Sequence, residues 1–258
     1  MSVRAKKHLG QHFLTDKNIC RKISDQYGLH EGCNRVLEIG PGMGALTEFL
    51  LNRPELEVSV MDIDTESIAY LKNHFPVLDG RIYEADFLRV DLKKYMGEEP
   101  FAVVGNFPYN ISSQILFKCL DYRDQIPEIM GMFQKEVAER VAEKPGSKTY
   151  GIMSVLLQAF YDINYCFTVD EHVFNPPPKV KSGVIRCTRN ERKKLDCNEE
   201  LFIRIVKMSF NQRRKTIRNS IKALIKDKGF DHPILNDRPE RLSVEQFIEL
   251  TQMVEKLT

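Results

Sequence analysis

The stretch Val36-Leu37-Glu38-Ile39-Gly40-Pro41-Gly42-Met43-Gly44 decides the fold of this 258-residue chain. Its first four residues form a short run typical of a buried strand. The glycines then predict a tight turn, after which a helix is expected over 45–51. A glycine-rich turn between a strand and a helix lets the backbone approach a ligand closely, with helix N–H groups directed at it. Nicotinamide, flavin and methyl-donor enzymes share such turns, so the stretch predicts a ligand site without naming the ligand.

The alternation of strand and helix continues along the chain. Further strands are predicted at 58–61, 81–85, 101–105 and 129–133, and helices at 66–75, 112–120 and 135–142. This order predicts an α/β fold with a parallel, doubly wound sheet. After a polar break at 144–148, we expect a helix at 152–160 and two late strands near 163–167 and 183–188.

The last quarter of the chain has a different character. Residues 190–198 are polar and charged, as in a linker, and the apolar residues beyond them follow helical spacing. We therefore expect a catalytic domain over 1–189 and a small all-helical domain over 190–258. Residues 188–258 carry 16 Lys and Arg against 11 Asp and Glu, although the net charge of the whole chain is only +2. A basic C-terminal part on a near-neutral body predicts contact with a polyanion.

The composition argues against several classes of protein. Hydrophobic residues make up 42% of the chain and charged residues 29%, which is ordinary for a soluble globular protein. No stretch has the apolar length of a membrane span, and no signal-like core follows the basic start, so a cytoplasmic protein without membrane contact is expected. The six cysteines are scattered and the histidines are not clustered, so we expect neither a disulfide framework nor a metal site.

Acidic residues mark the predicted ligand site. Asp62 closes the second strand, 22 residues after Gly40, where a carboxylate can accept hydrogen bonds from both hydroxyls of a ribose. Asp86 ends the third strand and is placed to accept from an adenine amine. Glu38 gives the pattern E-x-G-x-G-x-G, in which an acid suits a cationic methyl donor better than a pyrophosphate. These features favour S-adenosylmethionine over a dinucleotide; a turn or helix-capping role is the alternative for Asp62.

The tetrapeptide Asn106-Phe107-Pro108-Tyr109 follows the apolar run of the fourth strand. Asn106 Oδ1 and the Pro108 carbonyl can each accept one hydrogen of an adenine amine, which aims the nitrogen lone pair at a methyl group. Tyr109 can stack on an extruded base, and Phe107 is expected to pack. The tetrapeptide therefore predicts methyl transfer to an adenine nitrogen; an Asn-Pro turn with an incidental tyrosine is the structural alternative.

Two further segments carry predictions with open alternatives. Phe174, ahead of the Pro-rich segment 175–180, can close the other face of the base or pack in the core. A basic stretch near the C-terminus predicts contacts with RNA phosphates, and its members are Arg213, Arg214, Lys215, Arg218 and Lys222. The spacing of Arg214, Arg218 and Lys222 predicts one face of a helix, for which an ordinary solvated face is the alternative.

Nearly the whole chain resembles the ribosomal RNA adenine dimethyltransferase family, in its bacterial KsgA/RsmA branch. Residues 7–14 resemble the opening L-G-Q-N-F-L of the family, and residues 106–109 resemble its N-[LI]-P-Y motif. Residues 174–182 match F-x-P-x-P-K-V-x-S, and residues 210–216 match the F-x-x-R-R-K-T of its helical tail domain. Residues 38–44 match its donor-binding turn, Asp62 its ribose acid and Asp86 its adenine-edge acid.

The resemblance implies a Rossmann-like class I methyltransferase fold with S-adenosylmethionine as the cofactor. It also implies that Gln11, His12 and Leu14 line the cofactor pocket together with Gly40, Asp62, Asp86 and Asn106; Glu38 and Gly42 belong to the same predicted site. The implied reaction is N6,N6-dimethylation of two adjacent adenosines in small-subunit rRNA during ribosome biogenesis. The implied partner is the immature small ribosomal subunit, and a monomeric enzyme is expected.

The chain departs from the family pattern at two positions. His12 stands where the family usually has Asn, and Phe107 stands where it has Leu or Ile. Neither change touches the two amine acceptors, so activity is expected. The alternatives are a large-subunit rRNA dimethyltransferase, which usually lacks the opening and tail motifs, and a ribosome-assembly factor that acts mainly by binding. DNA adenine methyltransferases favour D/N-P-P-Y/F, and a nicotinamide dehydrogenase remains the alternative at the level of fold alone.

Overall fold

A computed structural model describes residues 3–226 and 229–257, and the chain divides into two compact units. The first unit runs to Ala138 and resumes over Ile163–Arg189, and the second comprises Glu139–Asp162 and the chain from Asn190 onward. The sequence assigned 139–162 to the first domain. The structure groups this segment with the C-terminal part instead, because helix α7 (Ile152–Gln158) contacts α8 (Glu199–Asn211) and α11 (Val244–Glu255).

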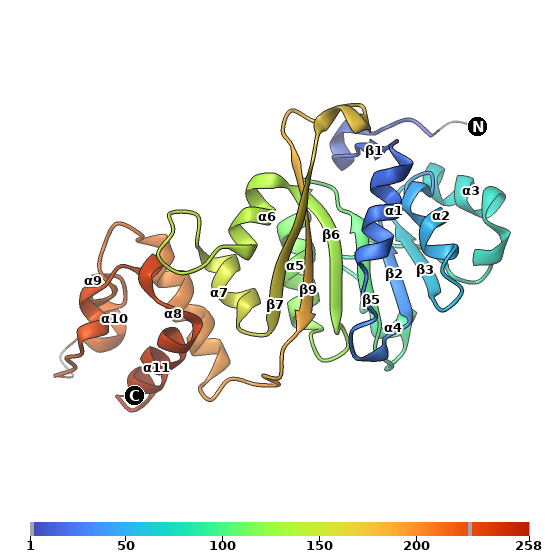
Figure 1. Cartoon of the computed structure of the whole chain (residues 1–258). Coiled ribbons are helices and arrows are strands. Elements are labelled where there is room, and N and C mark those ends of the chain that lie inside the picture. Colours follow the sequence, from blue (N-terminus) through green and yellow to red (C-terminus); the bar gives the residue numbers. More distant parts are fainter. Residues whose placement is uncertain (1–2, 227–228, 258) are drawn as a thin grey trace. The chain divides into compact units, whose positions relative to one another are not determined.

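A seven-stranded sheet with the order β4-β3-β2-β5-β6-β9-β7 is the centre of the first unit (Figure 1). Its strands are β2 (Arg35–Ile39), β3 (Glu57–Asp62), β4 (Ile82–Glu84), β5 (Ala102–Asn106), β6 (Glu128–Gln134), β7 (Tyr161–Val169) and β9 (Ser182–Arg189). Strands β2 to β6 pair in parallel, as predicted. Strand β9 is antiparallel to β6, so the sheet is mixed rather than wholly parallel. The chain enters β9 beside the end of β6, with Ser182 opposite Gln134, and must therefore run back along it.

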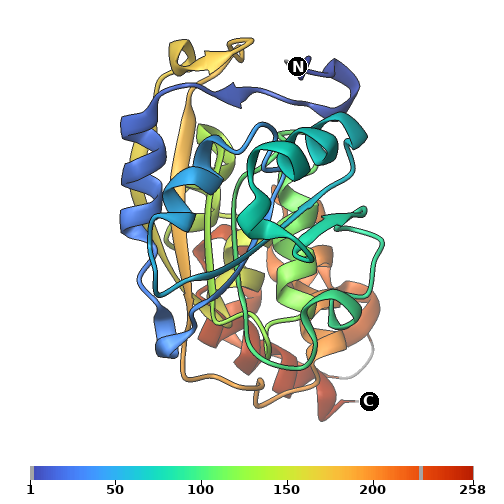
Figure 2. The same ribbon diagram turned by 90° about the vertical axis from the view of Figure 1, so that its right-hand side faces the viewer.

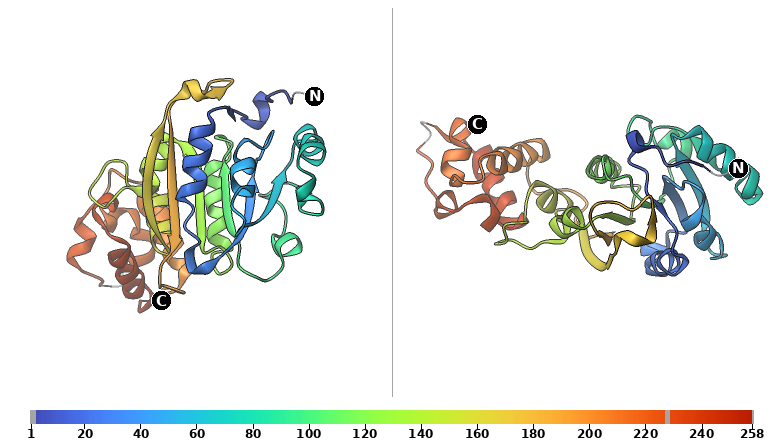
Figure 3. Two further views of the ribbon diagram at one scale, coloured as in Figure 1. Left: turned by 45° about the vertical axis from the view of Figure 1, so that its right-hand side comes forward. Right: turned by 90° about the horizontal axis from the view of Figure 1, so that it is seen from above.

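Helices cover both faces of this sheet, with α1 and α2 on one face and α5 on the other (Figures 1 and 3). The helices of the first unit are α1 (Lys17–Gln26), α2 (Ala45–Leu51), α3 (Thr65–His74), α4 (Lys93–Met96) and α5 (Ser112–Asp121), and α6 (Lys135–Ala142) crosses the unit boundary. Alternate strand residues point to the same face, so one core combines Val36, Val58, Val60 and Val104 with Cys20 and Ile23 of α1 and Leu46 and Leu50 of α2.

A short two-stranded ribbon joins distant parts of the first unit. Strand β1 (Phe13–Leu14) pairs antiparallel with β8 (Phe174–Asn175), with Leu14 opposite Phe174. The ribbon lies over the carboxyl ends of the parallel strands, at the top of Figure 2. It brings the N-terminal segment beside the Pro-rich segment at 175–180.

The second unit is helical. Besides α7, α8 and α11, its described residues include the single-turn α-helices α9 (Ile217–Ser220) and α10 (Lys222–Ile225). Helix α8 begins where the Asn198 side chain accepts a hydrogen bond from the Leu201 amide, at 2.9 Å. Most buried side chains of this unit are apolar, and they include Phe202, Ile205, Val206, Phe247 and Leu250.

Candidate functional site

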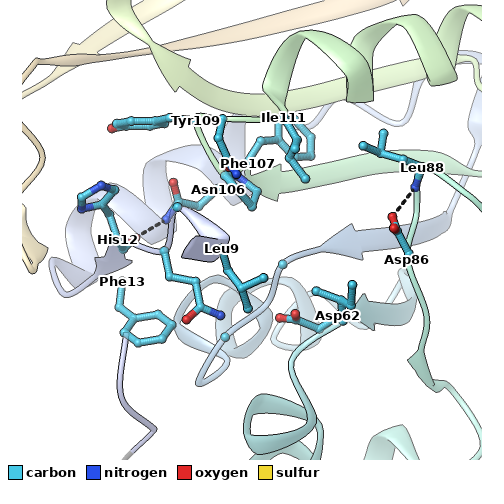
Figure 4. A pocket seen from close by; sticks show the side chains of 17 residues that line it. Leu9, His12, Phe13, Asp62, Asp86, Leu88, Asn106, Phe107, Tyr109 and Ile111 are labelled. Carbon is cyan, nitrogen blue, oxygen red and sulfur yellow. Dashed lines mark hydrogen bonds between the residues drawn. The ribbon is translucent and has the colours of Figure 1, made fainter. Parts of the chain in front are cut away.

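A cleft of about 830 Å³, partly open to solvent, lies at the carboxyl ends of the parallel strands (Figure 4). Ligands of open α/β sheets bind at this edge. The lining residues come from the N-terminal segment, from the turns after β2, β3 and β4, and from the end of β5. They include Gln11, His12, Gly40, Gly42, Asp62, Asp86, Asn106, Pro108 and Tyr109.

The glycine turn forms one wall of the cleft. Gly40 has a φ of +66° and Gly42 a φ of +54°, values that L side chains adopt only with strain. A Cβ at Gly42 would lie 2.8 Å from a ring carbon of Phe13, so the N-terminal segment packs directly on this turn. The glycines therefore serve both the turn and the close approach of a neighbouring segment.

Two acids face the cleft. Asp62 ends β3 and is 8% exposed, and its Oδ1 accepts a hydrogen bond from the Asp64 amide at 2.9 Å. Burial raises the pKa of Asp62, against the effect of hydrogen bonds from backbone amides. Asp86 follows β4, and its Oδ1 accepts from the Leu88 amide at 2.9 Å. Both acids lie at the edge that the sequence predicted.

Glu38 takes a different place from the other predicted cofactor residues. Its side chain is buried in β2 and does not line the cleft. Its Oε2 accepts a hydrogen bond from Thr47 Oγ1 of α2 at 2.6 Å. This bond joins the strand before the glycine turn to the helix after it, so Glu38 supports the turn from beneath.

The tetrapeptide at 106–109, predicted to be catalytic, lies at the end of β5. Asn106 Nδ2 donates a hydrogen bond to the His12 carbonyl oxygen at 2.9 Å, which fixes the amide and leaves Oδ1 as an acceptor (Figure 4). The Pro108 carbonyl accepts from the Ile111 amide at 3.2 Å, which uses one of its two lone pairs. Asn106 Oδ1 and the Pro108 carbonyl oxygen can therefore each still accept a hydrogen bond from a ligand, as the sequence predicted.

Tyr109 is held from two sides. Its hydroxyl shares a hydrogen bond with Ser182 Oγ, a fully buried group at the start of β9. Its ring centroid lies 5.4 Å from that of His12, whose Nδ1 is 2.8 Å from the Pro176 carbonyl oxygen. Burial raises the pKa of the Tyr109 hydroxyl, so the ring is neutral at physiological pH. A neutral, oriented ring is suited to stacking.

Phe107 packs, as the sequence predicted. Its ring is 1% exposed, and its centroid lies 5.0 Å from that of Phe133. It lies on the backbone of β6, because a Cβ at Gly131 would be 2.0 Å from a carbon of this ring. The absence of a side chain at Gly131 therefore makes room for the larger residue at position 107.

Besides Glu38, two further residues predicted for the site lie outside the cleft. Leu14 and Phe174 are 5% and 4% exposed and belong to the hydrophobic core of the first unit. Neither lines the cleft, because their pairing across the β1–β8 ribbon directs them into the core. For Phe174, this placement favours core packing, the second of its two alternatives.

Several residues of the site were not predicted from the sequence. Ser182 holds Tyr109, Asp64 holds the N-terminal segment, and Gly131 accommodates Phe107. The motif that matched F-x-P-x-P-K-V-x-S ends at Ser182, so its final serine was the available signal. The other two contacts join segments far apart in the sequence and have no local signal.

The basic stretch of the second unit does not lie on one helix. Helix α8 ends at Asn211, residues 212–216 form a turn and a helix start, and Arg218 and Lys222 belong to two separate single-turn helices. The prediction of a common helix face for Arg214, Arg218 and Lys222 is therefore wrong. Arg214, Lys215 and Lys222 are exposed, while Arg218 pairs with Asp231 and Arg213 donates to the Ser147 carbonyl.

Two features are absent from the described residues. Across 3–226 and 229–257, no group of three or more His, Cys, Asp or Glu residues is arranged to hold a metal ion. Within the same ranges, no helix combines the length and the apolar character needed to cross a membrane.

Comparisons with known proteins agree with this geometry. The profile described as "Ribosomal RNA adenine dimethylase" matches residues 2–256. A ribosomal RNA small subunit methyltransferase A of Cytophaga hutchinsonii is 58% identical over 98% of this chain and 98% of its own length. Among solved structures, a dimethyladenosine transferase from Plasmodium falciparum is 25% identical with a TM-score of 0.76, covering 95% of this chain and 98% of its own. The 23S rRNA methyltransferase ErmE is 26% identical with a TM-score of 0.66, covering 93% and 99%. The chain belongs to the ribosomal RNA adenine dimethylase family.

Proposed function

We propose that this protein transfers methyl groups from S-adenosylmethionine to the N6 amines of two adjacent adenosines in small-subunit rRNA, giving N6,N6-dimethyladenosine. The observation that carries the proposal is the orientation of the Asn106 amide. Its Nδ2 is engaged by the His12 carbonyl, so Oδ1 is the atom offered to a substrate amine, beside the Pro108 carbonyl. The high identity to small-subunit enzymes favours that substrate over large-subunit rRNA.

The residues of the cleft fit the cofactor. The Gly40–Gly42 turn brings backbone close to a ligand, and Asp62 offers a carboxylate to ribose hydroxyls. Asp86 is placed for the adenine amine, and Gln11 and His12 belong to the wall formed by the N-terminal segment. When bound there, S-adenosylmethionine supplies an electrophilic methyl group on a sulfonium.

The chain prepares the amine for this methyl group. An exocyclic adenine amine is a weak nucleophile, because its lone pair is delocalised into the ring. Asn106 Oδ1 and the Pro108 carbonyl each accept a hydrogen bond from one N–H of this amine. These bonds draw the nitrogen toward tetrahedral geometry and direct its lone pair at the methyl group. Tyr109, held by Ser182, supports the face of the extruded base. The alkylated amine is acidic enough to lose its proton to water, so no strong base is required.

The second unit supplies the contact with RNA in this proposal. Exposed cations at Arg214, Lys215 and Lys222 suit phosphate groups, which position a folded RNA without reading its sequence. The physiological substrate is then the immature small ribosomal subunit, and the enzyme acts as a cytoplasmic monomer.

Methyl transfer to under-methylated small subunits tests the proposal. We expect labelled methyl from S-adenosylmethionine to appear as dimethyladenosine in small-subunit rRNA, with Asn106→Ala lowering kcat about 10²- to 10³-fold, as for the loss of one transition-state acceptor. Asn164→Ala, on the exposed surface of β7, is the matched control and should retain full activity. Growth rescue by Asn106→Ala with normal binding to subunits would instead identify an assembly factor. Product in large-subunit rRNA would overturn the choice of substrate.

A further inference from the structure

Residues 6–13, which we call the N-terminal strap, contribute their last five residues to a wall of the cofactor cleft. Leu9, Gly10, Gln11, His12 and Phe13 all line the cleft, yet only the end of the strap belongs to a strand. Something other than a sheet must therefore hold residues 6–12 in place. Hydrogen bonds to one buried acid provide that hold.

The acid is Asp64, whose side chain is 0% exposed. Lys6 Nζ donates to Asp64 Oδ1, and Gln11 Nε2 donates to Asp64 Oδ2 at 3.1 Å. Lys6 Nζ also lies 3.1 Å from Glu66 Oε1, and the Lys6 amide donates to Gln11 Oε1 at 2.8 Å. Lys6 and Gln11 are thus both hydrogen-bonded to Asp64 at the start of α3.

Asp64 is also tied to the cofactor residues. Its amide donates to Asp62 Oδ1 at 2.9 Å, so the anchor of the strap and the proposed ribose acid share one turn after β3. At the other end of the strap, Phe13 packs on Gly42 of the glycine turn, and the His12 carbonyl holds the Asn106 amide. The strap therefore connects the cofactor side of the cleft with the catalytic amide.

Charge supports this arrangement. Burial alone would raise the pKa of Asp64, but the hydrogen bonds from Lys6 and Gln11 hold the pKa below its ordinary value. A buried carboxylate that remains ionised needs its cation, and removal of the cation leaves a charge without compensation.

We propose that Lys6 and Asp64 are positioning residues that clamp the N-terminal strap over the cofactor before the cofactor arrives. The inference rests on the proposed function, because it assigns the cleft to S-adenosylmethionine. A strap ordered in advance costs no ordering entropy on binding, whereas an unclamped strap reduces apparent affinity by the fraction of molecules in which it is in place.

The experiment measures binding of S-adenosylhomocysteine to the full chain by calorimetry. Lys6→Met removes the cation and is expected to weaken binding about tenfold, as for the loss of a hydrogen bond to a charged group. Lys6→Arg keeps the cation and should restore affinity. Lys7→Met is the matched control, since Lys7 is exposed and adjacent but makes no hydrogen bond to Asp64 within the described part of the chain, and it should bind as the wild type does.

Two further readouts separate positioning from a general loss of structure. Ligand-free Lys6→Met should still unfold in one cooperative transition, at a lower melting temperature because Asp64 loses its cation, while amide hydrogens of residues 9–13 should show a larger increase in exchange rate than those of the central sheet. In turnover, Lys6→Met should raise the KM for S-adenosylmethionine more than it lowers kcat.

The outcomes are distinct. If the wild type does not bind S-adenosylhomocysteine, the proposed function fails. If it binds, and Lys6→Met binds within twofold of wild type or is weakened no more than Lys7→Met, the clamp is refuted while the proposed function stands. Failure of Lys6→Arg to restore affinity would also overturn the clamp, because a cation at this position would then not be sufficient.

Discussion

Glu38 is an acid almost completely removed from solvent at the ligand-binding edge of the first unit. Its side chain is buried beneath the glycine turn, within hydrogen-bond distance of Thr47. Burial raises the pKa of Glu38 to about 8, against the effect of the Thr47 hydrogen bond and with a smaller contribution from the charge of Asp62. At neutral pH the folded protein therefore holds a largely protonated acid at this position, whereas the unfolded chain holds a carboxylate.

This difference predicts how stability changes with pH. Between pH 4.5 and about pH 8 the folded state binds more protons than the unfolded state at Glu38, so the free energy of unfolding falls as pH rises. The fall amounts to at most about 1.4 kcal/mol for each pH unit. Glu38→Gln cannot ionise and should remove this part of the slope, gaining stability relative to wild type from pH 5 to pH 8.

Urea unfolding of the ligand-free protein at several pH values measures the effect. Glu84→Gln, at the exposed end of β4, is the control and should keep the wild-type slope. Equal slopes in wild type and Glu38→Gln would show that burial does not shift this group.

Single residues could be predicted from the sequence where their role follows from a place at a strand end. Asp62, Asp86 and Asn106 each follow a stretch predicted to be a strand, and parallel strands bring such ends together. Leu14 and Phe174 could not be resolved in this way, because their direction depends on a ribbon between segments about 160 residues apart. The same holds for Ser182, whose partner Tyr109 is distant in the chain.

At the scale of elements, the packing between β5 and β6 depends on a small residue in β6 making room for a large one just after β5. Gly105 and Gly131 lie opposite each other in the parallel pair, and the Phe107 ring occupies the space above Gly131. Phe107 is the second residue of the tetrapeptide proposed to be catalytic, so the packing of β6 helps to set the course of the loop that carries Asn106 and Tyr109.

A side chain at position 131 should therefore disturb the site. We expect Gly131→Val to lower the free energy of unfolding by about 1–3 kcal/mol through overpacking, and to lower methyl transfer by displacing the tetrapeptide. Phe107→Leu alone leaves a cavity and should cost about 1–2 kcal/mol. The double variant should recover at least about 1 kcal/mol relative to the sum of the two changes, because the smaller side chain at position 107 leaves room for the new methyl groups.

Urea unfolding and methyl-transfer rates of the wild type, the two single variants and the double variant form a double-mutant cycle that measures this coupling. Additive losses of stability in the double variant would show that positions 107 and 131 do not depend on each other in this way.

The elements themselves were predictable to different degrees. Strands β2, β3, β5 and β6 begin and end within about a residue of the predicted runs, because buried strands are marked by continuous apolar sequence. The direction of β9 was not predictable, since an apolar run carries no information on whether it pairs parallel or antiparallel. The prediction of a single basic helix was wrong because the helical spacing of residues continues in the sequence across 212–216, where the chain leaves the helix.

At the scale of the whole molecule, the C-terminal part differs from the rest of the chain in both its charge and its secondary structure. The C-terminal part carries most of the excess positive charge, while the net charge of the chain is only +2. The structure adds 139–162 to the C-terminal unit, an insertion that sequence could not reveal because its helix has the same apolar character as any other. An RNA-binding role for this unit predicts that affinity depends on salt through a few exposed cations rather than through the overall charge.

Replacing two of these cations by acidic residues tests whether the second unit binds the RNA. Arg214→Glu with Lys222→Glu should weaken binding to small-subunit rRNA and reduce the slope of log affinity against log salt by about 0.7–0.9 for each phosphate group that the variant no longer binds. Lys72→Glu with Lys94→Glu makes the same change in net charge on exposed residues of α3 and α4 and should leave the slope nearly unchanged. Affinity for S-adenosylhomocysteine should be unaffected in both double variants, because neither pair lines the cofactor cleft. If both pairs reduce the slope equally, binding responds to net charge alone, and the second unit has no special part in holding the RNA.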